Sequence, residues 1–308
     1  HSRQTALAGP GIQPSGPIVN GILATAANPW RGKATEDNLS GKAGVQFDIA
    51  DTSTVYATYA RGYKGPAFNV FYNLQAVGTG VVDAETADAF ELGLKNTLFD
   101  GTLVLNIAAF YAKYYNFQAN NPDIVSGVVV TRFTNAGDVS TRGVELDFVW
   151  RTSSAFGLSG GIAYTDAHVD EFNIPPGGNP ANTIPSGTPL GYAPKWKGSL
   201  AADYRWETGG SIDVLFGLQG SYQSEQLSIF DANPIVRDAG IIDGYALVDA
   251  SIGIADKDDR FRVTVHVRNL FDESFAAAIS NGGPSGAYLY RIPREADRHF
   301  GITGRFNF

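Results

Sequence analysis

The sequence predicts an all-β fold, a transmembrane antiparallel meander β-barrel, and three observations support this class. Short segments alternate apolar and polar residues, the connections between them are alternately short and long, and the chain ends on an aromatic strand. In residues 298–308, Phe300, Ile302, Phe306 and Phe308 fall on one side of a strand, and polar residues fall on the other. A strand that faces lipid on one side and a wet lumen on the other needs this pattern.

Composition limits the remaining classes of protein. The chain of 308 residues has 23 basic and 31 acidic residues, and this formal net charge of −8 argues against nucleic acid as a partner. Cysteine is absent, so the sequence offers no disulfide framework and no thiolate site. No apolar run approaches the roughly 18 residues of a membrane helix. The 36 glycines, 14 tyrosines and 19 phenylalanines suit a β-barrel instead.

The first part of the chain contains two predicted hairpins. Residues 38–50 alternate apolar and polar side chains, and a short turn leads into the strand 54–61. The strands 90–98 and 103–117 are joined at Asp100-Gly101, a dipeptide typical of tight hairpin turns. Both pairs have the period of two that a strand with two different faces requires.

Two more hairpins are predicted in the middle of the chain. The strands 139–152 and 156–169 alternate large apolar residues with Gly, Glu and Asp. The strands 194–207 and 210–224 turn at Thr208-Gly209 and each carry one apolar side. The same two-sided pattern therefore continues along the chain.

A fifth hairpin and a single strand complete the pattern. The strands 245–255 and 260–269 are joined by the charged run Asp256–Asp259, and the strand 298–308 ends the chain. The charged run could suggest a calcium site. It lacks the alternating ligands and the distant Glu of a calcium loop, so we predict a solvated turn.

Eleven strands are thus predicted, and their connections alternate strictly in length. The short connections are turns at residues 51–53, 100–101, 153–155, 208–209 and 256–259. The long connections, predicted to be irregular loops, are residues 1–37, 62–85, 118–138, 170–193, 225–244 and 270–295. Outer-membrane barrels have short periplasmic turns and long extracellular loops, so the long connections are expected outside the cell.

Five segments resemble the TonB-dependent outer-membrane receptor family. They are VYATYARGYKGPAFN at 55–69, ETADAFELGLK at 85–95, NAGDVSTRGVELDF at 135–148, VRNLFDES at 267–274 and RHFGITGRFNF at 298–308. Their order covers residues 38–308 and implies the C-terminal half of a 22-stranded barrel, plugged by an N-terminal globular domain. The last segment also resembles the C-terminal signature of outer-membrane barrels. The resemblance implies that Phe300, Ile302, Phe306 and Phe308 form the assembly signal.

The resemblance divides the chain into two parts. Residues 1–37 are expected to be an extracellular loop segment, and residues 38–308 the C-terminal part of the barrel. The plug domain, the TonB box and the N-terminal strands are expected to be absent from this chain, which starts at His1 and has no methionine. An open half-barrel would leave two bare edges in lipid. We therefore expect the strands 38–50 and 298–308 to pair with strands outside this chain.

The sequence shows no constellation that would carry catalysis. It has no Gly-rich phosphate loop, zinc protease motif or nucleophile elbow, and its four histidines have no metal-ligand spacing. We predict no catalytic residues, no metal, no cofactor and no enzymatic activity. A barrel hydrolase is the least favoured alternative because no motif places a Ser beside a His.

Three sets of side chains were assigned from their positions. The charges expected to face the lumen, and to pair with each other or with a plug, are Glu91, Lys95, Glu145, Asp147, Asp203, Arg205, Arg262, Arg268 and Arg305. The aromatics expected in the interface girdle are Tyr63, Tyr114, Tyr115, Trp150, Trp196 and Trp206. The candidates for ligand binding in outer loops are Phe71, Tyr72, Phe172, Phe230, Arg237, Tyr288, Tyr290, Arg291 and Arg294. Loop packing is the alternative for this last set.

The resemblance implies energised uptake of a scarce ligand across the bacterial outer membrane. Its implied partners are outer-membrane lipid, TonB through the absent plug region, an extracellular small-molecule ligand and the remaining half of the barrel. An iron–siderophore complex is the family's commonest cargo, and cobalamin, haem and sugars are others. The alternatives from other classes are a passive porin or structural outer-membrane barrel, and a soluble β-module. The missing repeat of about 40 residues disfavours a propeller.

Overall fold

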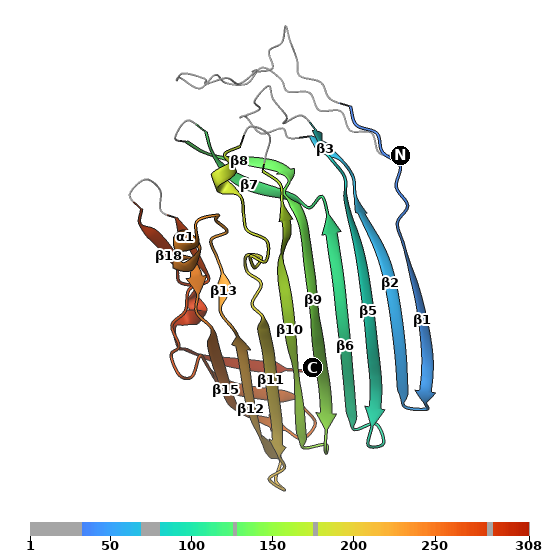
Figure 1. Ribbon diagram of the computed structural model, residues 1–308. Helices are drawn as coiled ribbons and strands as arrows, with labels where there is room; N and C mark the ends of the chain where they lie inside the picture. The colour runs from blue at the N-terminus through green and yellow to red at the C-terminus, as the bar shows by residue number, and fades with distance from the viewer. Residues whose placement is uncertain (1–32, 69–80, 126–127, 175–177, 282–285, 308) are drawn as a thin grey trace.

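One large antiparallel sheet dominates the computed structural model (Figure 1). The structure describes residues 33–68, 81–125, 128–174, 178–281 and 286–307. The sheet has 11 strands, in the order β1 (Gly41–Ala50), β2 (Ser53–Lys64), β5 (Glu85–Leu98), β6 (Leu103–Tyr115), β9 (Gly137–Arg151), β10 (Phe156–Phe172), β11 (Trp196–Trp206), β12 (Ile212–Gln223), β15 (Tyr245–Asp256), β16 (Phe261–Arg268) and β19 (His299–Phe306). Each strand pairs with the strand before it, so the predicted eleven-stranded meander is confirmed.

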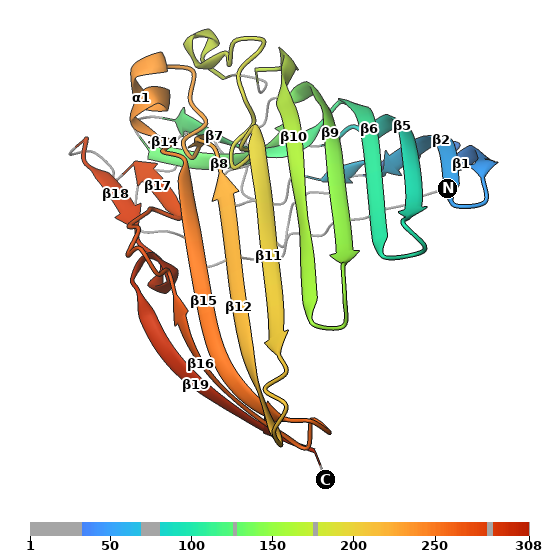
Figure 2. The ribbon, with the colours of Figure 1, turned by 90° about the horizontal axis from the view of Figure 1, so that it is seen from below.

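The sheet is curved, with β1 at one border and β19 at the other (Figure 2). These two strands lie at opposite ends of the strand order and do not pair with each other in the described chain. A closed eleven-stranded barrel would have contradicted the predicted receptor architecture. That β1 and β19 pair with strands elsewhere remains a prediction.

The short turns lie at one end of the sheet, which we call the turn end, and the described parts of the long connections lie at the other, which we call the loop end (Figure 1). The turn between β5 and β6 shows why the sequence needs Asp100-Gly101. Phe99 and Asp100 have φ angles of 51° and 52°, and Gly101 has a φ of 89°. Consecutive left-handed residues match the twist of a hairpin, and Asp and Gly adopt them at low cost.

The long connections are more regular than predicted. They contain four two-stranded sheets: β3 (Ala67–Phe68) with β4 (Val81–Val82), β7 (Gln118–Val125) with β8 (Val128–Asn135), β13 (Gln226–Leu227) with β14 (Ile241–Ile242), and β17 (Ala278–Asn281) with β18 (Tyr288–Arg291). The prediction of an irregular loop at 118–138 is therefore wrong. Pro122 lies within β7, opposite Thr131. A two-stranded sheet has only edge strands, so a proline there need not break a ladder.

Short helices also occur in these connections. They are η1 (Pro180–Asn182), α1 (Pro234–Ala239) and η2 (Arg294–Ala296). The Asn233 side chain accepts a hydrogen bond from the backbone N–H of Ile235 and caps α1, which starts with Pro234. Among the described residues, no helix has the length and apolar composition needed to cross a bilayer.

The loop-end connections pack on one another. The buried side chains of Val139, Val169 and Ile184 form a cluster there. Ser228 links three connections: its Oγ donates to the carbonyl oxygen of Ile279 over 2.7 Å, accepts from that residue's N–H over 2.8 Å, and lies 2.8 Å from the hydroxyl of Tyr192. The loop-end connections are therefore held together by packing and by hydrogen bonds.

The two faces of the main sheet differ in chemistry. The apolar face carries Phe90, Leu92, Val144, Ile162, Leu200 and Val265, which are between 48% and 59% exposed. The polar face carries Glu91, Lys95, Glu145, Asp147, Lys197 and Arg268. A sheet in water would cover its apolar side, so this continuous exposed apolar surface fits lipid contact.

Candidate functional site

The register of the strands brings distant polar residues together on the polar face. Lys95 pairs with Asn106, which pairs with Asp147, and Ala108 pairs with Glu145. Residues paired directly across an antiparallel sheet point to the same side. The sequence alone gave the face of each residue but not these neighbours.

A pocket of about 600 Å³ lies on the polar face over β1, β2, β5, β6 and β9. The Tyr56 hydroxyl donates to Glu91 Oε1 over 2.6 Å, and Lys95 Nζ lies 5.3 Å from the Tyr56 ring centroid. Asn106 Nδ2 donates to Asp147 Oδ2 over 2.9 Å. The wall of this pocket therefore presents carboxylates and an ammonium group. Hydrogen bonds from Tyr56 and Asn106 hold the carboxylates of Glu91 and Asp147 in place.

Tyr56 depends on a glycine in the neighbouring strand. Tyr56 pairs with Gly93, and a Cβ atom at position 93 would lie 2.3 Å from the Tyr56 ring. The ring lies across Gly93, so an aromatic side chain covers a strand position that has no side chain of its own. Glycine at 93 thus fixes where the Tyr56 hydroxyl reaches.

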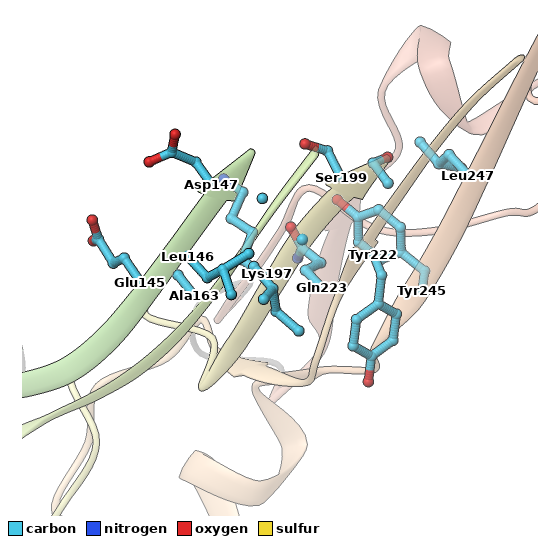
Figure 3. Close-up of a pocket in the computed structure, with 14 residues that line it drawn as sticks. Glu145, Leu146, Asp147, Ala163, Lys197, Ser199, Tyr222, Gln223, Tyr245 and Leu247 are labelled. Atoms are coloured by element: carbon cyan, nitrogen blue, oxygen red, sulfur yellow. The ribbon is translucent and has the colours of Figure 1, made fainter. Parts of the chain in front are cut away.

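A second pocket of about 450 Å³ lies over β9, β10, β11, β12 and β15. Figure 3 shows Glu145 and Asp147 at one end of this pocket and Tyr245 and Leu247 at the other. Lys197 and Gln223, between these ends, add a cation and an amide. Glu145 and Asp147 line both of these pockets, so these two carboxylates lie where the two pockets meet on the polar face.

The predicted lumenal charges find partners mainly outside their own set. Asp203 pairs with Arg151 at 2.8 Å and Arg268 with Asp249 at 3.5 Å, both across neighbouring strands. The prediction that these charges pair with each other is therefore wrong for Asp203 and Arg268. Their partners follow from the register, which places different carboxylates and guanidinium groups opposite them.

A cluster of charges closes the turn end of the polar face. Arg205 binds the buried Asp213 at 2.9 Å and Asp259 at 3.3 Å. Asp256 is also buried and binds Arg260 at 2.7 Å, so the expectation of a fully solvated turn at 256–259 is wrong for this residue. Partial burial would raise the pKa of Asp259, but hydrogen bonds and charge from Arg262 and Arg205 outweigh it and hold this pKa below its ordinary value.

The predicted ligand-binding residues do not form one cluster. Phe172 and Phe230 pack against the buried loop-end cluster of Val139, Val169 and Ile184. This packing agrees with the alternative assignment for these two aromatics. Their role in binding stays a prediction.

Other members of that predicted set lie elsewhere at the loop end. Arg237 lines a separate pocket of about 640 Å³, and its Nη1 donates to the carbonyl oxygens of Asp231 and Ala232. Tyr290 and Arg291 are exposed on β18, and Arg294 is exposed in η2. Tyr288, also on β18, is partly covered. Phe71 and Tyr72 lie outside the described residues.

The predicted assembly residues lie on the apolar face of β19. Phe300 pairs with Val267, Ile302 with Val265 and Phe306 with Phe261, and all three assembly residues are exposed. Phe308 lies outside the described residues. Their role in assembly stays a prediction.

One arrangement resembles the triad of a hydrolase and was missed in the sequence. Ser140 Oγ lies 3.3 Å from His168 Nε2, and His168 Nδ1 lies 3.6 Å from Asp166 Oδ1. Ser140 is only 5% exposed, and its hydroxyl donates to Asp170 over 2.9 Å. A nucleophile needs access to substrate and a base that takes its proton, so we assign these residues to a hydrogen-bond network. No group of three or more His, Asp or Glu side chains in the described chain is arranged to hold a metal ion.

The fold and its two faces define a membrane β-barrel segment of the outer-membrane type. The family described as TonB dependent receptor-like, beta-barrel matches residues 23–270. This match covers most of the chain, which therefore belongs to that family. Its eleven strands fit the C-terminal half of the barrel.

Individual relatives agree with this assignment. The pesticin receptor of Yersinia enterocolitica is 25% identical over 294 residues, which cover 91% of this chain and 38% of that protein. The ferrichrome outer membrane transporter/phage receptor of Escherichia coli (strain K12) is 23% identical over 278 residues, 90% of this chain and 33% of that protein. This chain thus spans well under half the length of these relatives.

Solved structures show the same fold. The ferric yersiniabactin uptake receptor FyuA from Yersinia pestis matches with a TM-score of 0.71 and 20% identity, over 92% of this chain and 40% of that one. The ferric-catecholate import receptor Fiu from K12 E. coli matches with a TM-score of 0.66 and 20% identity, over 99% of this chain and 40% of that one. The predicted fold class is confirmed.

Proposed function

We propose that the protein to which this chain belongs is an outer-membrane receptor for TonB-dependent uptake of an iron–siderophore complex. The observation that carries the proposal is a family sheet with an exposed apolar face and a polar face that is hollowed by pockets. Relatives described as receptors or transporters of ferrichrome, catecholate siderophores and ferric yersiniabactin support an iron-bearing cargo. In this proposal the loop end is extracellular and the turn end is periplasmic.

The proposed path of the ligand follows the polar face. The ligand first contacts the loop end, where Arg237, Tyr288, Tyr290, Arg291 and Arg294 are the described candidates. TonB acts through a plug region outside this chain and opens the lumen. The ligand then passes the polar wall.

The chemistry of that wall suits passage. Glu91, Lys95, Glu145, Asp147 and Lys197 offer both signs of charge there. Mixed charges give a polar ligand weak contacts along the wall without one tight trapping site. The proposed function includes no covalent step, and we propose a receptor without enzymatic activity.

Uptake of radioactive iron tests the proposal. The intact protein is expressed in an outer membrane that lacks other siderophore receptors, and cells receive iron-55 as ferrichrome, a ferric catecholate or ferric yersiniabactin. We expect at least one complex to accumulate, and we expect loss of TonB to abolish accumulation. Uptake that persists without TonB would identify a passive pore, and TonB-dependent uptake of another nutrient alone would identify a non-iron cargo.

A pair of variants tests the role of the polar wall. Glu145→Gln with Asp147→Asn removes the two carboxylates shared by both pockets, and we expect slower uptake with unchanged binding of the ligand at the loop end. The matched control is Asp203→Asn, also on the polar face but outside the lining of both pockets. Equal uptake by the double variant and the control would exclude a role for Glu145 and Asp147.

A further inference from the structure

A straight row of residues crosses the polar face through the pocket of about 450 Å³. Glu145 pairs with Ala163 of β10, and Ala163 pairs with Lys197 of β11. Lys197 pairs in turn with Gln223, and Gln223 pairs with Tyr245. Residues paired across an antiparallel sheet lie side by side on one face. The row therefore runs along the pocket, and all five of its residues line it.

The neighbouring row, two residues nearer the turn end, has small side chains. Asp147 pairs with Gly161, Gly161 pairs with Ser199, and Ser199 pairs with Ser221. Together with Ala163, these small residues form a recess between the longer side chains of the pocket. Its volume of about 450 Å³ is typical of sites that hold a small molecule.

Two opposite charges lie on either side of Ala163 and do not pair with each other. Adjacent strands are about 4.8 Å apart, so the backbones of Glu145 and Lys197, with β10 between them, lie about 10 Å apart. Within the part of the chain that the structure describes, neither side chain forms an ion pair or a hydrogen bond. A ligand that carries a cation and an anion close together can bridge this gap.

The same row contains an unsatisfied donor. The Nε2 atom of Gln223 is buried and has no hydrogen-bond partner among the described residues, although most buried polar groups in proteins have one. Gln223 lines the pocket beside Lys197, so rotation of its side chain directs this donor toward an acceptor next to the lysine ammonium. A carboxylate at that position would accept from both residues.

The charges that line the pocket are two carboxylates and one ammonium group, those of Glu145, Asp147 and Lys197. Asp147 already accepts a hydrogen bond from Asn106 over 2.9 Å. Glu145 and Lys197 are therefore the acceptor and the donor that still need a partner within the described chain. A simple anion or a simple cation would satisfy only one of them, whereas a group with both charges satisfies both.

The far end of the pocket is apolar. Tyr245 and Leu247 lie there, opposite the two carboxylates (Figure 3). The Tyr245 ring stacks on Phe275 with ring centroids 4.0 Å apart, and this stacking fixes its position. This end of the pocket therefore suits an apolar part of a ligand.

We propose that this pocket binds an amino-acid-type zwitterionic group of a small ligand. The ammonium group of the ligand binds Glu145, with Asp147 beside it, and the carboxylate of the ligand binds Lys197 and Gln223. An apolar substituent of the ligand packs toward Tyr245. This inference deepens the proposed function, on which it rests: the cargo that passes the polar wall carries such a zwitterionic group.

Disulfide tethering in the intact receptor tests the proposal, since this chain has no cysteine. Ala163→Cys, in a protein without any other cysteine, places a thiol between Glu145 and Lys197. The protein is equilibrated with the disulfides of four small thiols: cysteine, which is zwitterionic, cysteamine, which is cationic, 3-mercaptopropionate, which is anionic, and 2-mercaptoethanol, which is neutral. Intact-mass spectrometry measures the fraction of each mixed disulfide.

The matched control is Ser159→Cys. Ser159 lies on the same face of β10, but it pairs with Val149 and Ala201 and lies outside the pocket. Adduct ratios are taken relative to this control, which removes the intrinsic differences between the thiols. At Ala163→Cys we expect the cysteine adduct to exceed each of the others about threefold to fivefold, the size of one partly exposed ion pair.

Two further variants separate the two charge contacts. Cysteine and cysteamine differ only in the carboxylate, so Lys197→Gln should remove the advantage of cysteine over cysteamine. Cysteine and 3-mercaptopropionate differ only in the ammonium group, so Glu145→Gln should remove the advantage of cysteine over 3-mercaptopropionate. Heat-modifiable gel mobility confirms that each variant is folded.

Three results would overturn the proposal. The first is equal adduct ratios at Ala163→Cys and Ser159→Cys, and the second is ratios at Ala163→Cys that neither Lys197→Gln nor Glu145→Gln changes. The third is the absence of any adduct at Ala163→Cys, because another part of the intact protein would then fill the pocket. The assay uses no iron complex and no TonB, so its failure and that of the uptake proposal are distinguishable.

Discussion

The two faces of the same strands obey different rules. On β9, Phe148 points to the apolar face, and its neighbour Asp147 points to the polar face and accepts a hydrogen bond from Asn106. Apolar-face side chains need only be apolar, because lipid makes no directional demand. Polar-face side chains need partners at defined positions, because a buried or half-buried charge without one is costly. The apolar face therefore requires only apolar residues, whereas the polar face requires particular residues at positions that the register brings together.

The largest expected effect breaks a charge pair on the polar face. Arg205→Met leaves the carboxylate of Asp213, which is 2% exposed, without its guanidinium partner. We expect the free energy of unfolding to fall by about 3–5 kcal/mol, as for other buried pairs that lose one partner. Reversible denaturant unfolding of the intact protein in lipid vesicles measures this change.

The control for this change is Arg268→Met. Its partner Asp249 is 30% exposed, so solvent compensates for the lost pair and we expect a change within about 1 kcal/mol. Equal losses for Arg205→Met and Arg268→Met would show that burial does not determine the cost of breaking an ion pair on the polar face.

The next effect compares the faces directly. Val265 and Thr264 are neighbours on β16, opposite Ile302 and Thr303 of β19. Val265→Arg puts a charge on the apolar face and should cost about 2–4 kcal/mol near the bilayer midplane. Thr264→Arg should cost far less, because the polar face admits charge. Equal costs in the same refolding titration would contradict the assignment of faces.

A smaller effect tests whether the position of the Tyr56 ring depends on Gly93. Gly93→Ala forces the Tyr56 ring aside and disrupts its hydrogen bond to Glu91, at an expected cost of about 1–2 kcal/mol. Gly41→Ala is the control, since a Cβ there meets nothing within 4 Å. In a Tyr56→Ala background the cost of Gly93→Ala should largely disappear. An unchanged cost in that background would show that the ring does not depend on the glycine.

These comparisons explain which features the sequence could predict. The period of two and the Asp-Gly turn are local, so the eleven strands and their apolar face followed from single segments. The polar-face pockets could not be predicted from single segments, because Glu145 and Lys197 become neighbours only through the register of β9, β10 and β11. The sheet of β7 and β8 was missed because residues 118–138 were assigned as a whole to a long irregular loop.

The smallest expected effect concerns the turn end, where the polar face meets solvent. The arginines hold the pKa of Asp259 below its ordinary value of 3.8. A carboxylate with a lowered pKa in the folded state adds stability that is fully present above its unfolded pKa and is lost as pH falls through the folded pKa. The intact protein should therefore lose part of its stability below about pH 4, and Asp259→Asn should flatten this loss.

Because the Asp259 side chain is 46% exposed, solvent and salt screen the effect, and it should shrink further at high ionic strength. Unfolding midpoints between pH 5 and pH 3 measure it, with the more exposed Asp258→Asn as control. Parallel curves for the wild type and Asp259→Asn would show that the arginines do not act through this carboxylate.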